Sequence, residues 1–175
     1  PIITENYGIS PDGTTTATRI QLDKGVGTTA SDFAMIQKNT TTITGDDYSF
    51  SIYAKAVSGT PSVKFDLNNS ITYLDGVAQS GATAGVVTLS TTWQRIDVTV
   101  LDVIDTSRYP SIRLRGNFTT SDTADFLVWH PQLENVTNQS IQTAADYVAT
   151  TTTAVTKWFD TTQNGDLLRP IGWQD

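Results

Sequence analysis

Residues 48–57 alternate strictly between apolar and polar side chains, and this alternation restricts the fold more than any other feature of the sequence. The apolar set is Tyr48, Phe50, Ile52, Ala54 and Ala56, and the intervening set is Ser49, Ser51, Tyr53 and Lys55. Because successive side chains of a β-strand point to opposite faces, period two predicts a strand here. We expect the apolar set to face a core and the intervening set to face solvent.

The same alternation recurs in four shorter runs, at residues 15–22, 62–67, 93–101 and 111–115. The residues expected to face the core are Ile20, Leu22, Val63, Phe65, Leu67, Ile96, Val98, Val100, Ile112 and Leu114. Those expected to face solvent are Arg19, Gln21, Lys64, Asp66, Arg95, Asp97, Thr99, Arg113 and Arg115. Residues 125–133 are more apolar than the other runs, which predicts a strand buried on both faces. Many short strands separated by turn residues indicate a sandwich or a barrel.

Composition supports an all-β chain and narrows the classes of partner. Thr is the commonest residue, whereas Glu occurs only twice, so β-branched residues outnumber strong helix formers. The net charge of -7 disfavours binding to nucleic acid, whose phosphates are negative. With no cysteine, the 175 residues can form neither disulfides nor thiolate metal sites. No apolar run is long enough to span a membrane, so no membrane contact is expected.

Six short segments occur in an order that resembles one family of viral domains. They are 12–17 (DGTTTA), 48–56 (YSFSIYAKA), 93–95 (WQR), 129–134 (WHPQLE), 144–147 (AADY) and 154–156 (AVT). In this order they resemble the jelly-roll domains of phage virion and tail-associated proteins, which are similar in architecture to carbohydrate-binding modules and concanavalin A-like lectins. The resemblance covers the chain from about residue 5 to residue 156. It departs at His130–Pro131, where the family usually has two small residues, and at Val148–Ala149, where an Ile-Pro pair is common.

The resemblance implies a fold, a location and a function. The fold is an all-β jelly-roll β-sandwich of two antiparallel sheets over residues 1–149, followed by a C-terminal extension. The location is the phage virion, and the function is that of a tail-fibre or spike module that contacts polysaccharide on the host surface. Two alternatives stay open: a purely structural capsid-decoration or fibre-assembly domain, and a glycan-cleaving enzyme. Fold likeness alone does not establish function.

Candidate glycan-binding residues come from the sets expected to face solvent. Sugar rings stack on aromatic side chains and bond to planar hydrogen-bonding groups beside them. The candidates are Tyr53, Lys55, Arg95, Arg113 and Arg115, with Trp93 beside them. Their positive charges suit an acidic polysaccharide. The competing interpretation is an ordinary polar sheet face, where Lys and Arg protect an exposed edge.

A structural calcium ion is a further implication of the resemblance. Related carbohydrate-binding jelly rolls often hold Ca²⁺ between the N-terminal segment and a late strand. The oxygen ligands available for it are Glu5, Asp12, Asp125 and Glu134. No Asp-rich loop has EF-hand spacing, and solvated carboxylates are the competing interpretation. No other cofactor is expected.

Three patterns that could suggest catalysis have simpler explanations, and we expect no enzymatic activity. Residues 25–30 match the dinucleotide-binding pattern, but no helix is expected after them, so a hairpin loop is predicted. A Ser-His-Asp triad would need His130, the only histidine, which precedes Pro131 in an apolar run. Most Asp residues that could serve glycoside hydrolysis lie beside Gly, Asn or Ser, as turn residues do.

The segment 150–175 is expected to be an assembly element. It follows most of the family segments, yet it carries Trp158, Phe159, Leu167, Leu168, Ile171 and Trp173. Aromatic and aliphatic side chains of this kind are what buried interfaces favour. We therefore expect a homo-oligomer, with a trimer favoured by the resemblance, and contacts with other virion proteins. The competing interpretation is that the segment folds back over a sheet edge of its own domain.

Replacing Phe50 with alanine tests the predicted facing of residues 48–57. If Phe50 is central to the core, the free energy of unfolding should fall by roughly 3–5 kcal/mol, because a large cavity is left behind. Urea denaturation measures this loss. A decrease below about 1 kcal/mol, which is ordinary for exposed sites, would show that the facing is wrong.

Overall fold

The computed structural model describes residues 1–68, 70–140 and 142–147, and Pro1–Ala145 forms one compact unit. This described part contains thirteen strands and no helix, in agreement with the composition. The strands are β1 (Ile2–Gly8), β2 (Ala17–Asp23), β3 (Phe33–Gln37), β4 (Thr40–Thr41), β5 (Tyr48–Ala56), β6 (Ser62–Leu67), β7 (Tyr73–Leu74), β8 (Val77–Ala78), β9 (Val86–Thr88), β10 (Gln94–Val100), β11 (Ser107–Arg108), β12 (Pro110–Arg115) and β13 (Thr123–Asn135). The predicted extension, residues 150–175, and the boundary before it lie outside the described residues.

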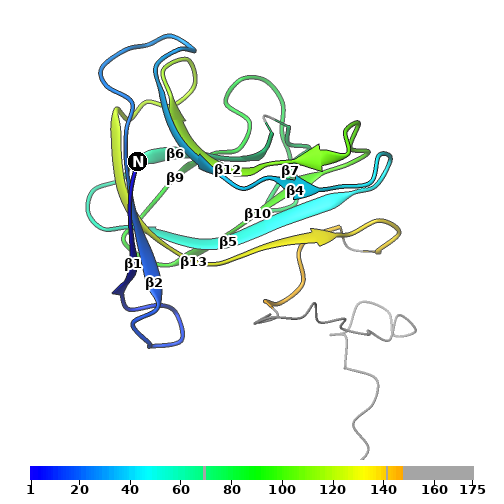
Figure 1. Cartoon of the computed structure of the whole chain (residues 1–175), viewed down its shortest axis with the longest axis horizontal. Helices are drawn as coiled ribbons and strands as arrows, with labels where there is room; N and C mark the ends of the chain where they lie inside the picture. The colour runs from blue at the N-terminus through cyan, green and yellow to red at the C-terminus, as the bar shows by residue number, and fades with distance from the viewer. Residues whose placement is uncertain (69, 141, 148–175) are drawn as a thin grey trace, which may run out of the picture. The chain divides into compact units, whose positions relative to one another are not determined.

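Two antiparallel sheets contain most of the strands (Figure 1). The large sheet has seven strands in the order β1-β2-β13-β5-β10-β7-β8. The small sheet has four strands in the order β3-β12-β6-β9, and β4 pairs separately with β11. Buried side chains from the large and small sheets belong to one hydrophobic cluster, as in a sandwich. The expectation of an all-β fold with two main antiparallel sheets is therefore confirmed.

Four strand pairs are nested in the sequence. The outermost pair is β2 with β13, and inside it lie β3 with β12, then β5 with β10, and finally β6 with β9. Each successive pair belongs to the other sheet until the chain turns back between β6 and β9. Most strands therefore find their partners far away in the sequence, and the large sheet cannot be completed without the last strand.

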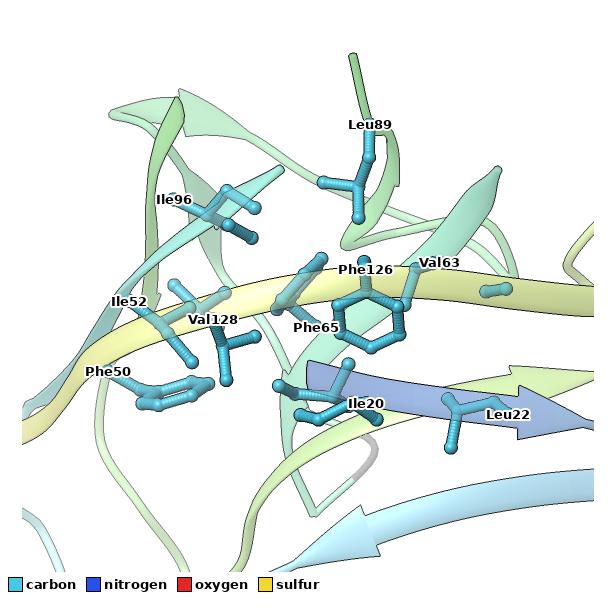
Figure 2. Packing of buried hydrophobic residues seen from close by; sticks show 14 of the residues in the cluster. Ile20, Leu22, Phe50, Ile52, Val63, Phe65, Leu89, Ile96, Phe126 and Val128 are labelled. Carbon is cyan, nitrogen blue, oxygen red and sulfur yellow. The ribbon is translucent and has the colours of Figure 1, made fainter. Parts of the chain in front are cut away.

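The alternation predicts the core correctly. All the residues of the alternating runs that were expected to face the core are buried, among them Phe50, Ile52, Phe65, Ile96, Val98 and Leu114. Figure 2 shows side chains of β5, β6, β10 and β13 gathered in this core, with Phe126 and Val128 contributed by β13. β13 lies between β2 and β5, and its residues 126–128 are buried. The prediction that the whole run 125–133 is buried on both faces is wrong, because Trp129 and His130 are partly exposed and Pro131 is exposed.

The prediction that the intervening residues of β5 and β10 face solvent is wrong for Ser49, Ser51, Asp97 and Thr99, which are buried. The segment 142–145, which we call the strap, is bonded to this outer face of the large sheet. Thr99 Oγ1 donates to the Gln142 carbonyl at 2.8 Å, and the Ala144 N–H donates to Asp97 Oδ2 at 2.9 Å. Alternation identifies the side of a strand that faces the second sheet, but not a loop that covers the other side.

Burial also corrects the prediction for the small sheet, where Lys64, Asp66 and Arg113 were expected to face solvent and are instead buried. Arg113 Nη2 donates to Asp66 Oδ1 at 2.7 Å, and the Ser111 hydroxyl donates to the same oxygen. A buried charge is tolerated when it is paired and hydrogen-bonded. The opposite charges of Asp66 on β6 and Arg113 on β12 therefore allow polar side chains on the outer side of the small sheet to be buried.

Removing one member of this ion pair should destabilise the sandwich strongly. Arg113→Met leaves the Asp66 carboxylate, which is 0% exposed, without its guanidinium, and such losses cost about 3–5 kcal/mol. Urea denaturation measures the change, and adding Asp66→Asn should restore part of it. Arg115→Met, a half-buried cation of the same strand, is the matched control. An equal loss in the two single variants would contradict a special role for the pair.

Candidate functional site

Aromatic rings from β5, from β13 and from the residue before β10 gather on the outer face of the large sheet. Trp129 lies opposite Tyr53 in the pairing of β13 with β5, and their rings meet edge to face at 5.6 Å. On the same face, the Lys55 ammonium lies over the Trp93 ring, 5.0 Å from its centroid. We call Tyr53, Lys55, Trp93 and Trp129 the aromatic face. All four are partly exposed, so each ring presents apolar surface beside polar groups.

A β-bulge places a fourth ring on this face. The pairing of β13 with β5 shifts register between Trp129 and Gln132, and His130 has a φ of 48°. In a regular strand His130 would point away from Trp129, whereas here the two rings stack with centroids 3.3 Å apart. Bulges commonly redirect a side chain in this way. A left-handed backbone conformation is uncommon at a non-glycine residue, so His130 stands out as a residue whose orientation the bulge determines.

The turn between β1 and β2 borders the aromatic face. Trp129 Nε1 donates to Thr16 Oγ1 at 3.1 Å, which joins β13 to this turn. Within the turn, Asp12 Oδ1 accepts from the Ser10 hydroxyl at 2.7 Å and from the Thr14 N–H at 3.0 Å. These hydrogen bonds, with that from Ser10 the strongest, lower the pKa of Asp12 to about 2. A fixed carboxylate and several hydroxyls therefore lie next to the rings.

The pKa of His130 is lowered from its usual value because partial burial disfavours the charged imidazolium. The negative charge of Asp12 acts in the opposite direction and raises it. His130 is therefore mainly neutral near pH 7, when it offers one donor and one acceptor nitrogen. Its two ring nitrogens add directional hydrogen-bonding groups to a predominantly aromatic surface.

The five residues predicted to bind glycan do not form one surface. Tyr53, Lys55 and Arg95 lie on the outer side of the large sheet, whereas Arg113 and Arg115 belong to the small sheet. Because the two sheets face each other across the core, their outer sides point in opposite directions. Arg113 is also buried, so it cannot contribute to an exposed platform.

Two of these arginines bond to the backbone of neighbouring segments. Arg95 Nη2 donates to the Ala144 carbonyl at 3.0 Å and also to that of Ala145, so it holds the strap. Arg115 Nε donates to the Ala30 carbonyl at 2.7 Å. Of the predicted platform, Tyr53 and Lys55 remain directed at the aromatic face, and Trp93 joins them.

The four predicted calcium ligands are not brought together. Asp12 is engaged in its turn, while Asp125 forms an ion pair with Arg19 across β2 and β13. Glu134 Oε2 accepts from the Ala145 N–H at 2.8 Å, and Glu5 is exposed in β1. Among the described residues, no group of three or more His, Asp or Glu side chains is arranged to hold a metal ion.

Residues 25–30, whose glycines resemble a dinucleotide-binding pattern, form part of the loop between β2 and β3. A loop was predicted, but this one connects the large sheet to the small sheet and is therefore not a hairpin. Lys24 Nζ closes it by donating to the Gly27 carbonyl at 2.8 Å. The glycines of this pattern therefore belong to a loop that connects the two sheets.

Trp129 and His130 are the site residues that sequence reasoning missed. Both fall in the run that was predicted to be buried on both faces, and neither was chosen as a candidate for glycan binding. One signal was present, since His130–Pro131 interrupts an otherwise apolar strand, as expected of a bulge. The proximity of Thr16 had no local signal, because it depends on pairing between β2 and β13.

No protein-family model matches the chain, and no curated protein is significantly similar to it. Within residues 1–68, 70–140 and 142–147, no helix is long and apolar enough to cross a membrane. The arguments below therefore depend on the geometry of the chain and on the resemblance of its segments.

Titration of the single histidine tests the electrostatics of this site. The pKa of His130 should lie below 6.5, and Asp12→Asn should lower it further because the favourable negative charge is removed. For a depressed folded-state pKa, stability is lost as pH falls from the unfolded value through the folded one. NMR of the imidazole protons follows the titration without ambiguity of assignment. A pKa at or above 6.5 would contradict burial of this ring.

Proposed function

We propose that this chain is a non-enzymatic, glycan-binding jelly-roll module of a phage virion appendage. The nested strand pairs support the jelly-roll topology. In a jelly roll, eight strands pair first with last and so on inward, and are folded over two sheets. The pairs β2 with β13, β3 with β12, β5 with β10 and β6 with β9 follow that order. On this assignment, β1, β7 and β8 extend the large sheet at its two edges.

The observation that carries the glycan-binding proposal is the aromatic face. Tyr53 and Trp129 offer rings of different orientation, 61° apart, on which the apolar faces of sugar rings can pack. The Lys55 ammonium, the His130 ring and the hydroxyl-rich turn supply hydrogen-bonding groups around them. Partly exposed aromatic side chains that gather on one sheet face beside polar groups are typical of interaction surfaces.

The assignment to a virion appendage depends on the resemblance of the sequence segments. Four of the six segments meet at the aromatic face: 12–17 supplies the turn, 48–56 supplies Tyr53, 93–95 supplies Trp93, and 129–134 supplies Trp129. Residues that identify the family in sequence are therefore neighbours in space. This supports a shared surface role in addition to a shared fold.

A purely structural module is the second candidate, and the edge strand β1 favours it. Every residue of β1 before Gly8 is exposed, including Ile2 at 63% and Ile3 at 55%. An exposed apolar edge strand can pair with another chain. A trimer or another virion protein could use this edge without any contact to sugar.

Binding to an array of bacterial surface polysaccharides tests the proposal. The unaltered domain should bind at least one acidic or neutral glycan, and Tyr53→Ala and Trp93→Ala should each weaken binding about tenfold, equivalent to 1.4 kcal/mol. Both positions are partly exposed, so the midpoint of thermal unfolding should change little. Phe33→Ala is the matched control, because Phe33 is an exposed aromatic residue on the small sheet.

Failure of the domain to bind any glycan, with virions labelled by an antibody to it, would favour the structural module. Equal loss of binding in Phe33→Ala would place the sugar elsewhere. Release of new reducing ends from a bound polysaccharide would instead support the glycan-cleaving enzyme.

A further inference from the structure

A cavity of about 330 Å³ lies apart from the aromatic face, near the ends of β6 and β10. Its walls come from the segments on either side of β7 and β8, from the turn after β10, and from β11. The hydroxyl-bearing residues Ser70, Thr72 and Ser80 line it, together with apolar residues such as Ile71 and Val100. Two cationic residues, Lys64 and Arg108, also line this cavity and distinguish it from an ordinary surface depression.

Lys64 is a buried cation without an ion-pair partner among the described carboxylates. The residue is 5% exposed, and its Nζ donates to the Ala82 carbonyl at 3.2 Å. The ammonium also lies 4.4 Å from the centroid of the Phe118 ring. Burial lowers the pKa of Lys64, the nearby charge of Asp66 raises it, and those of Arg113 and Arg115 lower it. Lysine is almost never fully buried unless it is paired.

Arg108 is buried beside the same cavity and keeps an unused donor. Nη1 donates to the Ser70 hydroxyl at 3.1 Å, and Nη2 lies 3.6 Å from the half-exposed Asp105 carboxylate. Nε is buried and has no hydrogen-bond partner within the described residues. A buried donor that is left unsatisfied is unfavourable, and more so when the group is charged.

We propose that this cavity is a binding site for an oxyanion: a carboxylate, sulfate or phosphate group. Such a group would accept hydrogen bonds from Lys64, from Arg108 and from the hydroxyls of the lining. It would also supply a carboxylate-like negative charge to Lys64, which has no ion pair among the described residues, and to Arg108, whose contact with Asp105 is long at 3.6 Å. The cavity is large enough for a small anion with part of the molecule that carries it. This inference is independent of the aromatic face and of whether that face binds glycan.

Asp102 provides a second test of the proposal, because removing its negative charge should strengthen anion binding, whereas removing the positive charge of Lys64 should weaken it. It is exposed and lines the same cavity, so its carboxylate repels an entering anion. Its backbone has a φ of 51°, a left-handed conformation that asparagine adopts readily. Its N–H donates to Asp47 Oδ1 and does not involve the side chain, so Asp102→Asn removes the charge with little disturbance.

Titration of the full chain with sodium sulfate, sodium phosphate and sodium glucuronate tests the site at constant ionic strength. Calorimetry should show saturable binding that is lost in Lys64→Met and tightened about threefold or more in Asp102→Asn. The exposed Lys38→Met should bind like the unaltered chain. Because sulfate raises the melting temperature of proteins generally, calorimetry and not melting decides the result.

NMR of the Lys64 ammonium provides a second measurement, whose expected result differs from that for a lysine with a purely structural role. A bound anion favours the charged form, so saturation with sulfate should raise the pKa of Lys64. Addition of sulfate should leave the NMR signals of the exposed Lys38 unchanged. This readout does not depend on the folding of any variant.

The three salts distinguish the sources of the anion. Tighter binding of glucuronate than of sulfate and phosphate would identify an acidic saccharide, and the reverse order would identify a free inorganic anion. No saturable binding of any of the three overturns the proposal. So does equal binding by the unaltered chain and Lys64→Met together with an unchanged pKa of Lys64.

Discussion

Insertion of β13 between β2 and β5 is the interaction on which the rest of the structure depends. β13 is the last strand described, and its backbone bonds join a strand near the N-terminus to one at residues 48–56. Without it, β1 and β2 would have no connection to the remainder of the large sheet. Phe126 and Val128 on its inner side complete the core, while Trp129 on its outer side faces Tyr53. One pairing event therefore closes the sandwich and assembles the aromatic face.

The strap then divides the outer side of the large sheet into two parts. Where it crosses β5 and β10, Asp97 and Thr99 are enclosed and bond to its backbone. Beyond the strap, Tyr53 and Lys55 of β5 remain partly exposed. Arg95 lies at this boundary, because its guanidinium bonds to the strap while its strand neighbour Tyr53 belongs to the aromatic face. The hydrogen bonds from Arg95 to the carbonyls of the strap therefore set the boundary of the candidate site.

Local alternation predicted the inner sides of the strands, since this pattern depends only on which side meets the second sheet. It could not predict the outer sides, because what covers them is distant in sequence. Arg113 and Arg115 illustrate the limit: they occupy equivalent positions in β12, yet Arg113 is buried against Asp66 and Arg115 is half-exposed. Tyr53 and Lys55 were found because their strand is regular. Trp129 and His130 were missed because a bulge changes the direction of side chains, which a strict period of two cannot represent.

Charge is distributed unevenly over this acidic chain, with consequences for both candidate sites. The chain carries a net charge of -7, yet Lys64, Arg108 and Arg113 are all buried, and all three come from β6, β11 and β12. The net negative field opposes the approach of anions from solution, but dissolved salt screens it over about 10 Å. Buried cations are screened much less, so their attraction survives at ionic strengths that weaken the field of the surface. An anion at the cavity would thus be selected by contact with Lys64 and Arg108, whereas a glycan at the aromatic face, which has one ammonium among its rings, would be selected by shape.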